Sequence, residues 1–219
     1  MLPMSMKIIA AGFCFALAAA ALPLSGPAGA EPVPPLAARS ELDAFLWPGT
    51  EPPRRLDQHG DRLRPESLRD RLVVVSFVHA DCTIACAVRV LDLDKLAQAL
   101  PAPLRERVTF LSIGTDPARD DPARLRAFAE GLVGKTTRLR FLDSDAASTA
   151  ALAAALRYPP AALPEPPPTI LVFDRTGRMA MAYGGDPLDG PRLLQDLTLL
   201  ETFENGIGRP ARGEARDPA

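Results

Sequence analysis

A run at residues 72–78 that is apolar except for Ser76 lies shortly upstream of two cysteines four positions apart, Cys82 and Cys86. A run rich in β-branched residues, without polar alternation, is typical of a strand buried on both faces. Downstream of the cysteines, apolar residues recur largely at helical spacing until Pro101 ends the helix. This order predicts an α/β fold with the cysteines at the carboxyl end of a central strand, where open sheets of this class place their functional groups.

The rest of the chain continues to alternate between predicted strands and helices. In chain order, the further predicted elements are a small hairpin at 56–63, strands at 108–113 and 139–142, helices at 121–132 and 145–157, a strand hairpin at 169–183 and a helix at 191–203. Residues 158–168 are rich in proline, offer few backbone donors and predict irregular structure. The alternation predicts one domain with a central mixed sheet and helices on both faces.

Residues 1–30 have the three parts of a secretory signal: Lys7, an apolar stretch at 8–22, and the small residues Ala28 and Ala30 before a cleavage point. An uncleaved membrane anchor is the alternative. Cleavage after Ala30 would leave Cys82 and Cys86 as the two cysteines of the exported chain, in a compartment that favours disulfides. We therefore expect an exported protein of the bacterial periplasm, either soluble or held at the membrane by its N-terminal segment.

Composition divides the remainder into a Pro/Ala-rich spacer at 31–53, a folded domain at 54–205 and a flexible tail at 206–219. Hydrophobic residues make up 47% of the chain, which is enough for a packed core and excludes general disorder. The 25 basic and 27 acidic residues are not gathered into a basic block, and aromatic residues are few. This balance argues against a nucleic-acid-binding surface.

The cysteine pair could be a structural disulfide, a redox dithiol or two metal ligands. The structural role is the weakest of these, because closing so short a loop removes little entropy from the unfolded chain. At the start of a helix, Cys82 would be favoured as a thiolate, so it suits the attacking role and Cys86 the resolving role. The same two thiolates suit Cu(I), whereas zinc would normally need four ligands.

Four features of the sequence resemble the SCO/SenC family of copper chaperones. They are Asp57-Gln58-His59-Gly60, the strand ending at Phe77, the spacing of Cys82 and Cys86, and Asp116-Pro117-Ala118-Arg119-Asp120 after the second strand. The resemblance extends over residues 56–204 and implies a thioredoxin-like fold. It also implies a role in assembling the CuA centre of cytochrome c oxidase, by copper insertion or by reduction of its cysteines, with a protein partner that carries cysteines or a copper site, such as an oxidase subunit.

The sequence departs from the family pattern at positions that bear on the chemistry. Thr83 and Ala87 stand where the family has a proline after each cysteine, and Pro166-Pro167-Pro168 occupies the place of the family's copper-binding histidine. No histidine follows His79. The Pro168–Thr169 step instead resembles the loop that faces the active cysteines of thioredoxin-type proteins, often with a cis bond. That likeness implies that Pro168 and Thr169 line the groove for a partner's mixed disulfide.

We therefore predict thiol–disulfide exchange by Cys82 and Cys86, which needs no cofactor, as the main hypothesis. The alternative is a metallochaperone in which Cys82 and Cys86 hold Cu(I). His79, three residues before Cys82, is the candidate third ligand. A histidine that packs beside such a site or tunes its thiolate is the commoner arrangement. Asp116, Arg119 and Asp120 are expected to brace the loop that enters the helix at 121–132.

Overall fold

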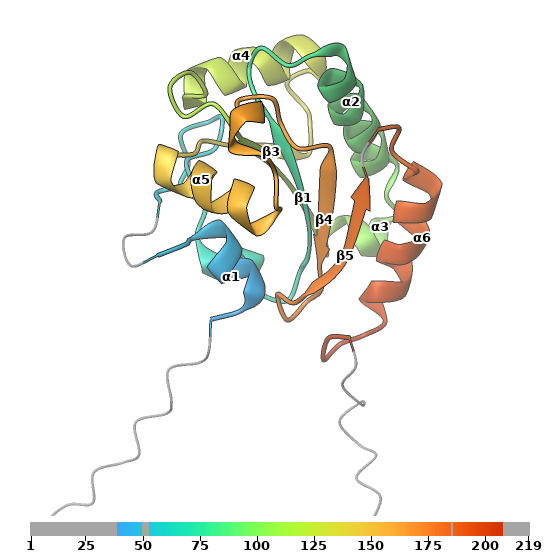
Figure 1. The fold of residues 1–219 in the computed structure, drawn as a ribbon. Helices are drawn as coiled ribbons and strands as arrows, with labels where there is room; N and C mark the ends of the chain where they lie inside the picture. The colour runs from blue at the N-terminus through green and yellow to red at the C-terminus, as the bar shows by residue number, and fades with distance from the viewer. Residues whose placement is uncertain (1–38, 50–52, 185, 208–219) are drawn as a thin grey trace, which may run out of the picture. The chain divides into compact units, whose positions relative to one another are not determined.

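The computed structural model describes residues 39–49, 53–184 and 186–207, which contain one mixed five-stranded sheet (Figure 1). The strand order is β3-β2-β1-β4-β5. The strands are β1 (Leu72–Val78), β2 (Val108–Gly114), β3 (Leu139–Leu142), β4 (Thr169–Phe173) and β5 (Met179–Gly184). β1 pairs with β2 in parallel and with β4 antiparallel, while β3 runs parallel to β2 and β5 antiparallel to β4. The strands predicted from the sequence are confirmed.

Helices cover both faces of this sheet (Figure 1). One face packs against α2 (Ile84–Ala99), α3 (Ala102–Arg105), α4 (Pro122–Leu132) and α6 (Gly190–Glu201). The other packs against α1 (Glu41–Leu46), the 3-10 helix η1 (Pro65–Leu68) and α5 (Ala146–Ala155). A second 3-10 helix, η2 (Pro160–Ala162), lies in the proline-rich loop. The predicted mixed sheet with helices on both faces is confirmed.

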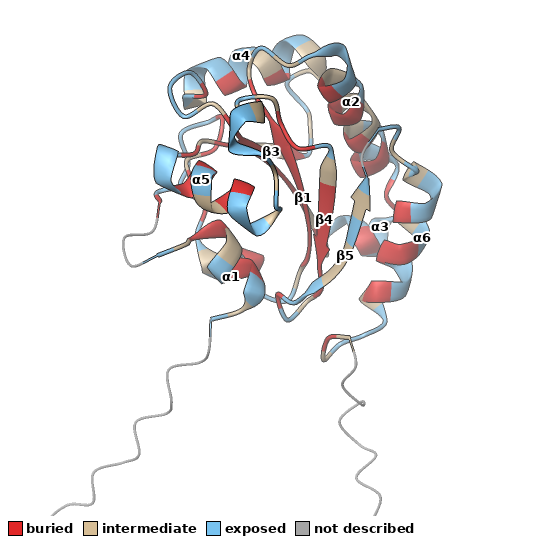
Figure 2. Cartoon of the chain, in the orientation of Figure 1, coloured by how far each residue is buried: buried red, intermediate tan, exposed pale blue. Residues whose placement is uncertain are grey.

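The central strand β1 contributes to both hydrophobic cores. Val74 and Val78 belong to the core on the α2 side, and Val75 and Phe77 to the core on the α1 side. Successive side chains of a strand point to opposite faces, so a strand covered on both sides is largely apolar on both faces. The buried polar side chain of β1, Ser76, is paired by a hydrogen bond with Ser112. Figure 2 shows β1 buried along its whole length, which fixes the end of the strand, and hence the cysteines, on a rigid element.

Helix α1 lies inside the predicted spacer, so the assignment of residues 40–49 to a spacer is wrong. Leu42, Leu46 and Trp47 are 2%, 0% and 4% exposed and belong to the core on the α1 side. Ser40 caps the helix by accepting a hydrogen bond from the Asp43 N–H. The Pro/Ala-rich surroundings hid a short apolar face that is too brief to show helical periodicity. The upstream part of the spacer, and the predicted signal at 1–30, lie outside the described residues.

Buried Arg55 fastens α1 to the opposite edge of the sheet. Its Nε donates to the Leu46 carbonyl at 2.9 Å, and one terminal nitrogen donates to the Asp143 carbonyl and to Ser144 Oγ at 3.1 and 3.0 Å. Burial lowers the pKa of the Arg55 guanidinium to about 10, against the opposing charges of Asp145 and Asp143. The guanidinium therefore acts as a cross-link made of charge-assisted hydrogen bonds.

The predicted hairpin at 56–63 is present as a tight turn closed by a bridge between Leu56 and Arg62. Asp57 Oδ1 accepts the backbone N–H groups of His59 and Asp61, and Gln58 bonds both to the Phe141 N–H and to the Leu139 carbonyl. The turn thus covers the open edge of β3, which would otherwise expose unpaired backbone groups. These contacts give the Asp57-Gln58-His59-Gly60 motif a structural role.

Order extends slightly beyond the start of the predicted tail at 206. The Ile207 N–H donates to Asp174 Oδ2 at 3.0 Å, and Gly206 is buried with a positive φ of 82° that favours glycine. The predicted start of the tail is therefore two residues too early, and positions 208–219 lie outside the described residues. Within the described ranges, none of the helices combines the length and apolar character needed to cross a bilayer.

Candidate redox site

Cys82 and Cys86 form a disulfide at the junction of β1 and α2, with their Cα atoms 5.5 Å apart. The two halves differ in exposure: Cys86 is 0% exposed, whereas Cys82 is partly exposed. The predicted pair is therefore brought together. An incoming sulfur can reach Cys82 from solvent, but it has no direct approach to Cys86.

The start of α2 corrects one detail of the predicted asymmetry. The helix begins at Ile84 with Thr83 as its N-cap, so Cys82 precedes the cap and Cys86 lies in the first turn. The helix dipole acts over the first turn, so it stabilises a thiolate at Cys82 less than the sequence suggested. The distinction between an attacking and a resolving sulfur rests instead on exposure.

Asp120 braces the loop between β1 and the cysteines. One carboxylate oxygen accepts the Ala80 N–H and the other accepts the Asp116 N–H, each at 2.8 Å. Burial of this carboxyl raises its pKa, while the two backbone N–H groups oppose the rise. The carboxyl also lies close to Gly114, where an added Cβ would come within 2.9 Å of the Asp120 Cβ. Glycine at the end of β2 thus lets the brace sit against the sheet.

Asp81, immediately before Cys82, forms ion pairs with two arginines of the segment that follows β2. It pairs with Arg119 and, at 2.9 Å, with Arg124 of α4. The expected bracing of the loop that enters α4 rests on Asp120, which accepts from the Asp116 N–H, and on Asp116, which accepts from the Ala118 N–H. The contacts of Asp81 and Ala80 in addition tie this loop to the segment before Cys82. They fix the backbone that presents Cys82.

The proline-rich loop is fastened over the start of α2 by three side chains. Glu165 Oε1 accepts from Thr83 Oγ1 at 2.8 Å, and its other oxygen lies 3.6 Å from His79 Nε2. Thr115 donates to the Pro164 carbonyl at 2.6 Å, and buried Arg89 donates to the Pro167 carbonyl at 2.9 Å. Thr83, which replaces a proline of the family pattern, is therefore a contact between the cysteine segment and this loop.

His79 is 8% exposed and uses both ring nitrogens within the protein. Nδ1 accepts the Asp81 N–H at 3.2 Å, and Nε2 lies 3.6 Å from a carboxylate oxygen of Glu165. In the part of the chain that the structure describes, no three His, Cys, Asp or Glu side chains are grouped so that they could hold a metal ion. The structure thus does not bring His79 together with both sulfurs as a ligand set.

Pro168 is exposed and Thr169 opens β4, opposite Gly184 of β5. The cis peptide bonds of the described chain precede Pro164 and Pro187. The bond before Pro168 is therefore trans, unlike the cis bond that loops of this kind often contain. The Arg89 contact with the Pro167 carbonyl nevertheless holds the end of the loop beside α2, one turn beyond Cys86.

Sequence reasoning missed Glu165, Arg89 and Thr115. Glu165 is the charged residue within the proline-rich stretch 158–168, and Arg89 interrupts the apolar face of α2. Arg89 is 3% exposed and pairs with Asp186 at 3.0 Å. A charge inside an apolar pattern signals a buried partner, but the partner itself depends on the fold.

Comparisons with known proteins identify a family model and a relative that match parts of this chain. The SCO1/SenC family model matches residues 51–161, which include both cysteines and make up just over half of the chain. A Stutzerimonas stutzeri protein named for copper binding is 29% identical over 92 residues, covering 40% of this chain and 45% of that protein. The chain thus aligns with less than half of that relative's length.

Solved structures of Sco proteins share the fold. BsSco, a member of the Sco family of cytochrome c oxidase assembly proteins, is 20% identical with a TM-score of 0.57, covering 69% of this chain and 92% of that one. Copper-bound yeast Sco1 is 18% identical with a TM-score of 0.56, covering 75% and 92%. Copper-bound Bradyrhizobium japonicum ScoI is 20% identical with a TM-score of 0.54, covering 67% and 95%. These neighbours establish the thioredoxin-like α/β fold, and with the match of the family model they show that the chain belongs to the SCO1/SenC family.

Proposed function

We propose that this chain is an exported SCO/SenC protein that exchanges disulfides with a protein partner through Cys82, in the assembly of cytochrome c oxidase. The observation that carries the proposal is the disulfide between a partly exposed cysteine and a buried one, presented by a braced loop. This arrangement separates an entry sulfur from a resolving sulfur, as sequential thiol–disulfide exchange requires.

The exchange proceeds in two balanced steps. The reduced chain attacks a partner disulfide with the Cys82 thiolate, so that a mixed disulfide forms and one partner sulfur leaves as a thiolate that takes up a proton. The Cys86 thiolate then attacks the Cys82 sulfur, which closes the Cys82–Cys86 bond and releases the second partner thiol. The partner disulfide is reduced and the cysteine pair is oxidised, and the reverse order runs in the opposite direction.

The surface beside Cys82 suits a protein partner. Ile84 is 85% exposed and Val88 is 45% exposed, and they lie one turn apart on α2, on either side of Cys86 in sequence. Exposed Pro168 ends the loop that Arg89 holds beside this helix. Exposed apolar side chains next to a reactive sulfur favour a partner that also contributes apolar contacts. Pro168 and Thr169 retain their proposed role of lining the partner's groove.

One related protein and the sequence-based signal support this setting. BsSco is a cytochrome c oxidase assembly protein in which a disulfide switch was identified, and it shares the fold of this chain. The sequence-based signal at 1–30 supports export to the periplasm.

The second candidate function is delivery of Cu(I) as cargo, held by Cys82 and Cys86 after reduction. It is favoured by the copper-bound states of yeast Sco1 and Bradyrhizobium japonicum ScoI and by the copper-binding Stutzerimonas stutzeri relative. Two adjacent thiolates suit this soft ion. A third ligand would have to come from His79, after it leaves Glu165, or from the partner.

Competition between the reduced chain and a Cu(I) chelator separates the two functions. We expect weak binding that His79→Ala leaves unchanged, because His79 is engaged by Asp81 and Glu165. Fast reoxidation of the same sample by glutathione disulfide is expected in parallel. Tight one-to-one Cu(I) binding that is lost in His79→Ala would contradict the redox proposal and establish the copper function.

Replacement of Glu165 should accelerate exchange. The Glu165 carboxylate accepts a hydrogen bond from Thr83, the residue after Cys82, and a nearby negative charge disfavours a thiolate. We expect Glu165→Gln to increase the rate of attack on glutathione disulfide at neutral pH by roughly 3- to 10-fold. The measurement is a stopped-flow rate followed over pH.

Two further variants serve as comparisons for this result. Glu204→Gln removes an exposed carboxylate elsewhere and should leave the rate unchanged. Thr83→Val breaks the hydrogen bond to Glu165 but keeps the charge, so its rate should stay closer to wild type than that of Glu165→Gln. Equal rates for Glu165→Gln and Glu204→Gln would show that Glu165 does not influence Cys82.

A further inference from the structure

A cavity lies beside helix α1 and the 3-10 helix η1. It has a volume of about 470 Å³ and is lined by residues of α1, η1 and the segment before η1. The lining residues are Arg39, Asp43, Trp47, Arg62, Leu63, Arg64, Pro65, Glu66 and Arg69. None of these lining residues belongs to the cysteine segment, to α2 or to the proline-rich loop 158–168. The cavity is therefore independent of the redox site.

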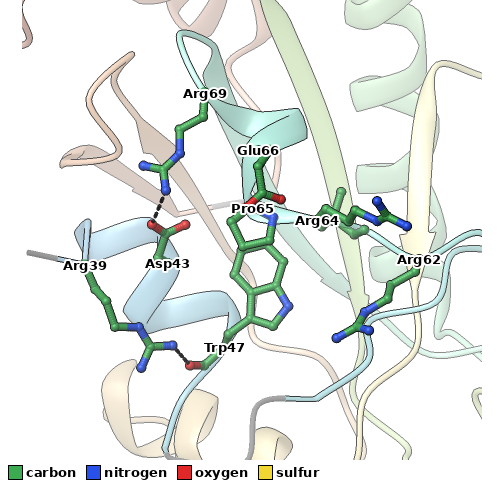
Figure 3. Close-up of a pocket in the computed structure, with 9 residues that line it drawn as sticks. Arg39, Asp43, Trp47, Arg62, Arg64, Pro65, Glu66 and Arg69 are labelled. Atoms are coloured by element: carbon green, nitrogen blue, oxygen red, sulfur yellow. Dashed lines mark hydrogen bonds and ion pairs between the residues drawn. The ribbon is translucent and has the colours of Figure 1, made fainter. Parts of the chain in front are cut away.

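The charge of this cavity is opposite to that of the whole protein. Four arginines face two carboxylates, which leaves an excess of two positive charges, while the chain as a whole carries a net charge of −2. Figure 3 shows Arg39 and Arg69 on one side of Trp47, and Arg62 and Arg64 on the other. A local excess of this size in a net-negative protein attracts anions to the cavity.

The four arginines differ in how their guanidinium groups are bound within the protein. Arg39 donates to the Trp47 carbonyl, and Arg69 lies 3.4 Å from Asp43 Oδ2. Among the residues drawn in Figure 3, by contrast, no hydrogen bond or ion pair reaches the guanidinium groups of Arg62 and Arg64. Each keeps a planar set of donors that matches the oxygens of a phosphate or carboxylate.

The cavity also has an apolar wall, formed by Trp47, Leu63 and Pro65. Trp47 is 4% exposed and its hydrogen bonds in the described chain run through its backbone, so its indole ring serves as a packed wall. A volume of about 470 Å³ falls within the usual range of small-molecule sites and exceeds what a bare inorganic anion needs. There is room for an organic group beside the charged one.

We propose that this cavity binds a phosphate monoester that carries a small organic group. At neutral pH such a phosphate has a charge of about −1.5 to −2, which matches the positive excess of the lining residues. Arg62 and Arg64 bind the phosphate oxygens, and the organic group packs against Pro65, which is partly exposed. Arg39 and Arg69 stay tied to the protein and shape the opposite wall.

Trp47 is the single tryptophan of the chain, so its emission reports on this cavity alone. We expect glycerol 3-phosphate, added to the full chain at constant ionic strength, to change the emission saturably, whereas glycerol does not. Arg62→Gln/Arg64→Gln should weaken binding at least about tenfold, the loss expected when a charged donor pair is removed. The control variant is Arg71→Gln/Arg138→Gln, at two arginines that line a different cavity. It should change the dissociation constant by less than about twofold.

The same phosphate chemistry occurs on a dissolved metabolite and on the headgroup of phosphatidic acid. Vesicles of phosphatidylcholine, with and without phosphatidic acid, distinguish the two sources. Tighter binding to phosphatidic acid vesicles than to glycerol 3-phosphate assigns the lipid headgroup, and equal or weaker binding assigns the dissolved ester. The proposal is overturned if no probe changes the emission saturably up to about 10 mM, or if the Arg62/Arg64 variant, shown by circular dichroism to be folded, binds as the wild type does.

Discussion

Cys86→Ser is expected to accumulate a mixed disulfide at Cys82 when the reduced chain meets a disulfide-bearing partner or glutathione disulfide. The exposed Cys82 can still attack, but the second step has no thiolate to complete it. The amount of mixed disulfide should exceed the trace expected for the wild type by at least about tenfold, because only slow external thiols can then resolve it. Mass spectrometry of the acid-quenched chain measures it directly.

The reciprocal variant is the control for this experiment. Cys82→Ser keeps a thiol at Cys86, which is 0% exposed, so little adduct should form. Comparable adducts on the two variants would contradict the assignment of entry and resolving roles. A purely structural disulfide would give the same small amount of mixed disulfide in Cys86→Ser and in Cys82→Ser.

Leu46→Ala is expected to lower the free energy of unfolding by about 2–5 kcal/mol, the usual range for a buried leucine reduced to alanine. Leu46 is 0% exposed in α1, and its carbonyl accepts from buried Arg55. The cavity left behind would face the core that contains Phe77 and Phe173 of the sheet. Urea unfolding followed by circular dichroism gives the value.

Leu199→Ala provides the matched substitution, because Leu199 lies in α6 and is 53% exposed. Its effect should stay within about 0.5 kcal/mol, as for most surface positions. If Leu46→Ala were equally mild, α1 would not belong to the cooperative unit, and the domain would begin after residue 53 as the composition suggested.

The central strands could be predicted because their physical signal is local. β1 was bounded correctly from a run of β-branched residues, and α4 from Asp121 and Pro122 at its start. Helix α1 was missed because six residues give fewer than two turns of periodicity, and their burial depends on the distant Gly177 carbonyl and on Arg55. Short elements are specified by tertiary contacts, which a sequence pattern does not show.

The cysteine pair was predicted from its spacing and its place after β1, but its surroundings were not. Glu165 reaches Thr83 across 82 residues of sequence, and Arg89 reaches Asp186 across 97. Neither pairing leaves a trace in local composition. The proline-rich segment indicated where regular structure is absent, but it did not indicate which peptide bond is cis.

Equilibration of the wild-type chain in glutathione buffers of graded potential, followed by alkylation and mass measurement, tests the redox role most directly. A reversible two-electron transition is expected, reached from both the oxidised and the reduced side, with Cys82 alkylated before Cys86. A pair that stays oxidised across the whole series, or alkylates at both sulfurs at the same rate, would contradict the claim that Cys82 and Cys86 exchange disulfides with a partner.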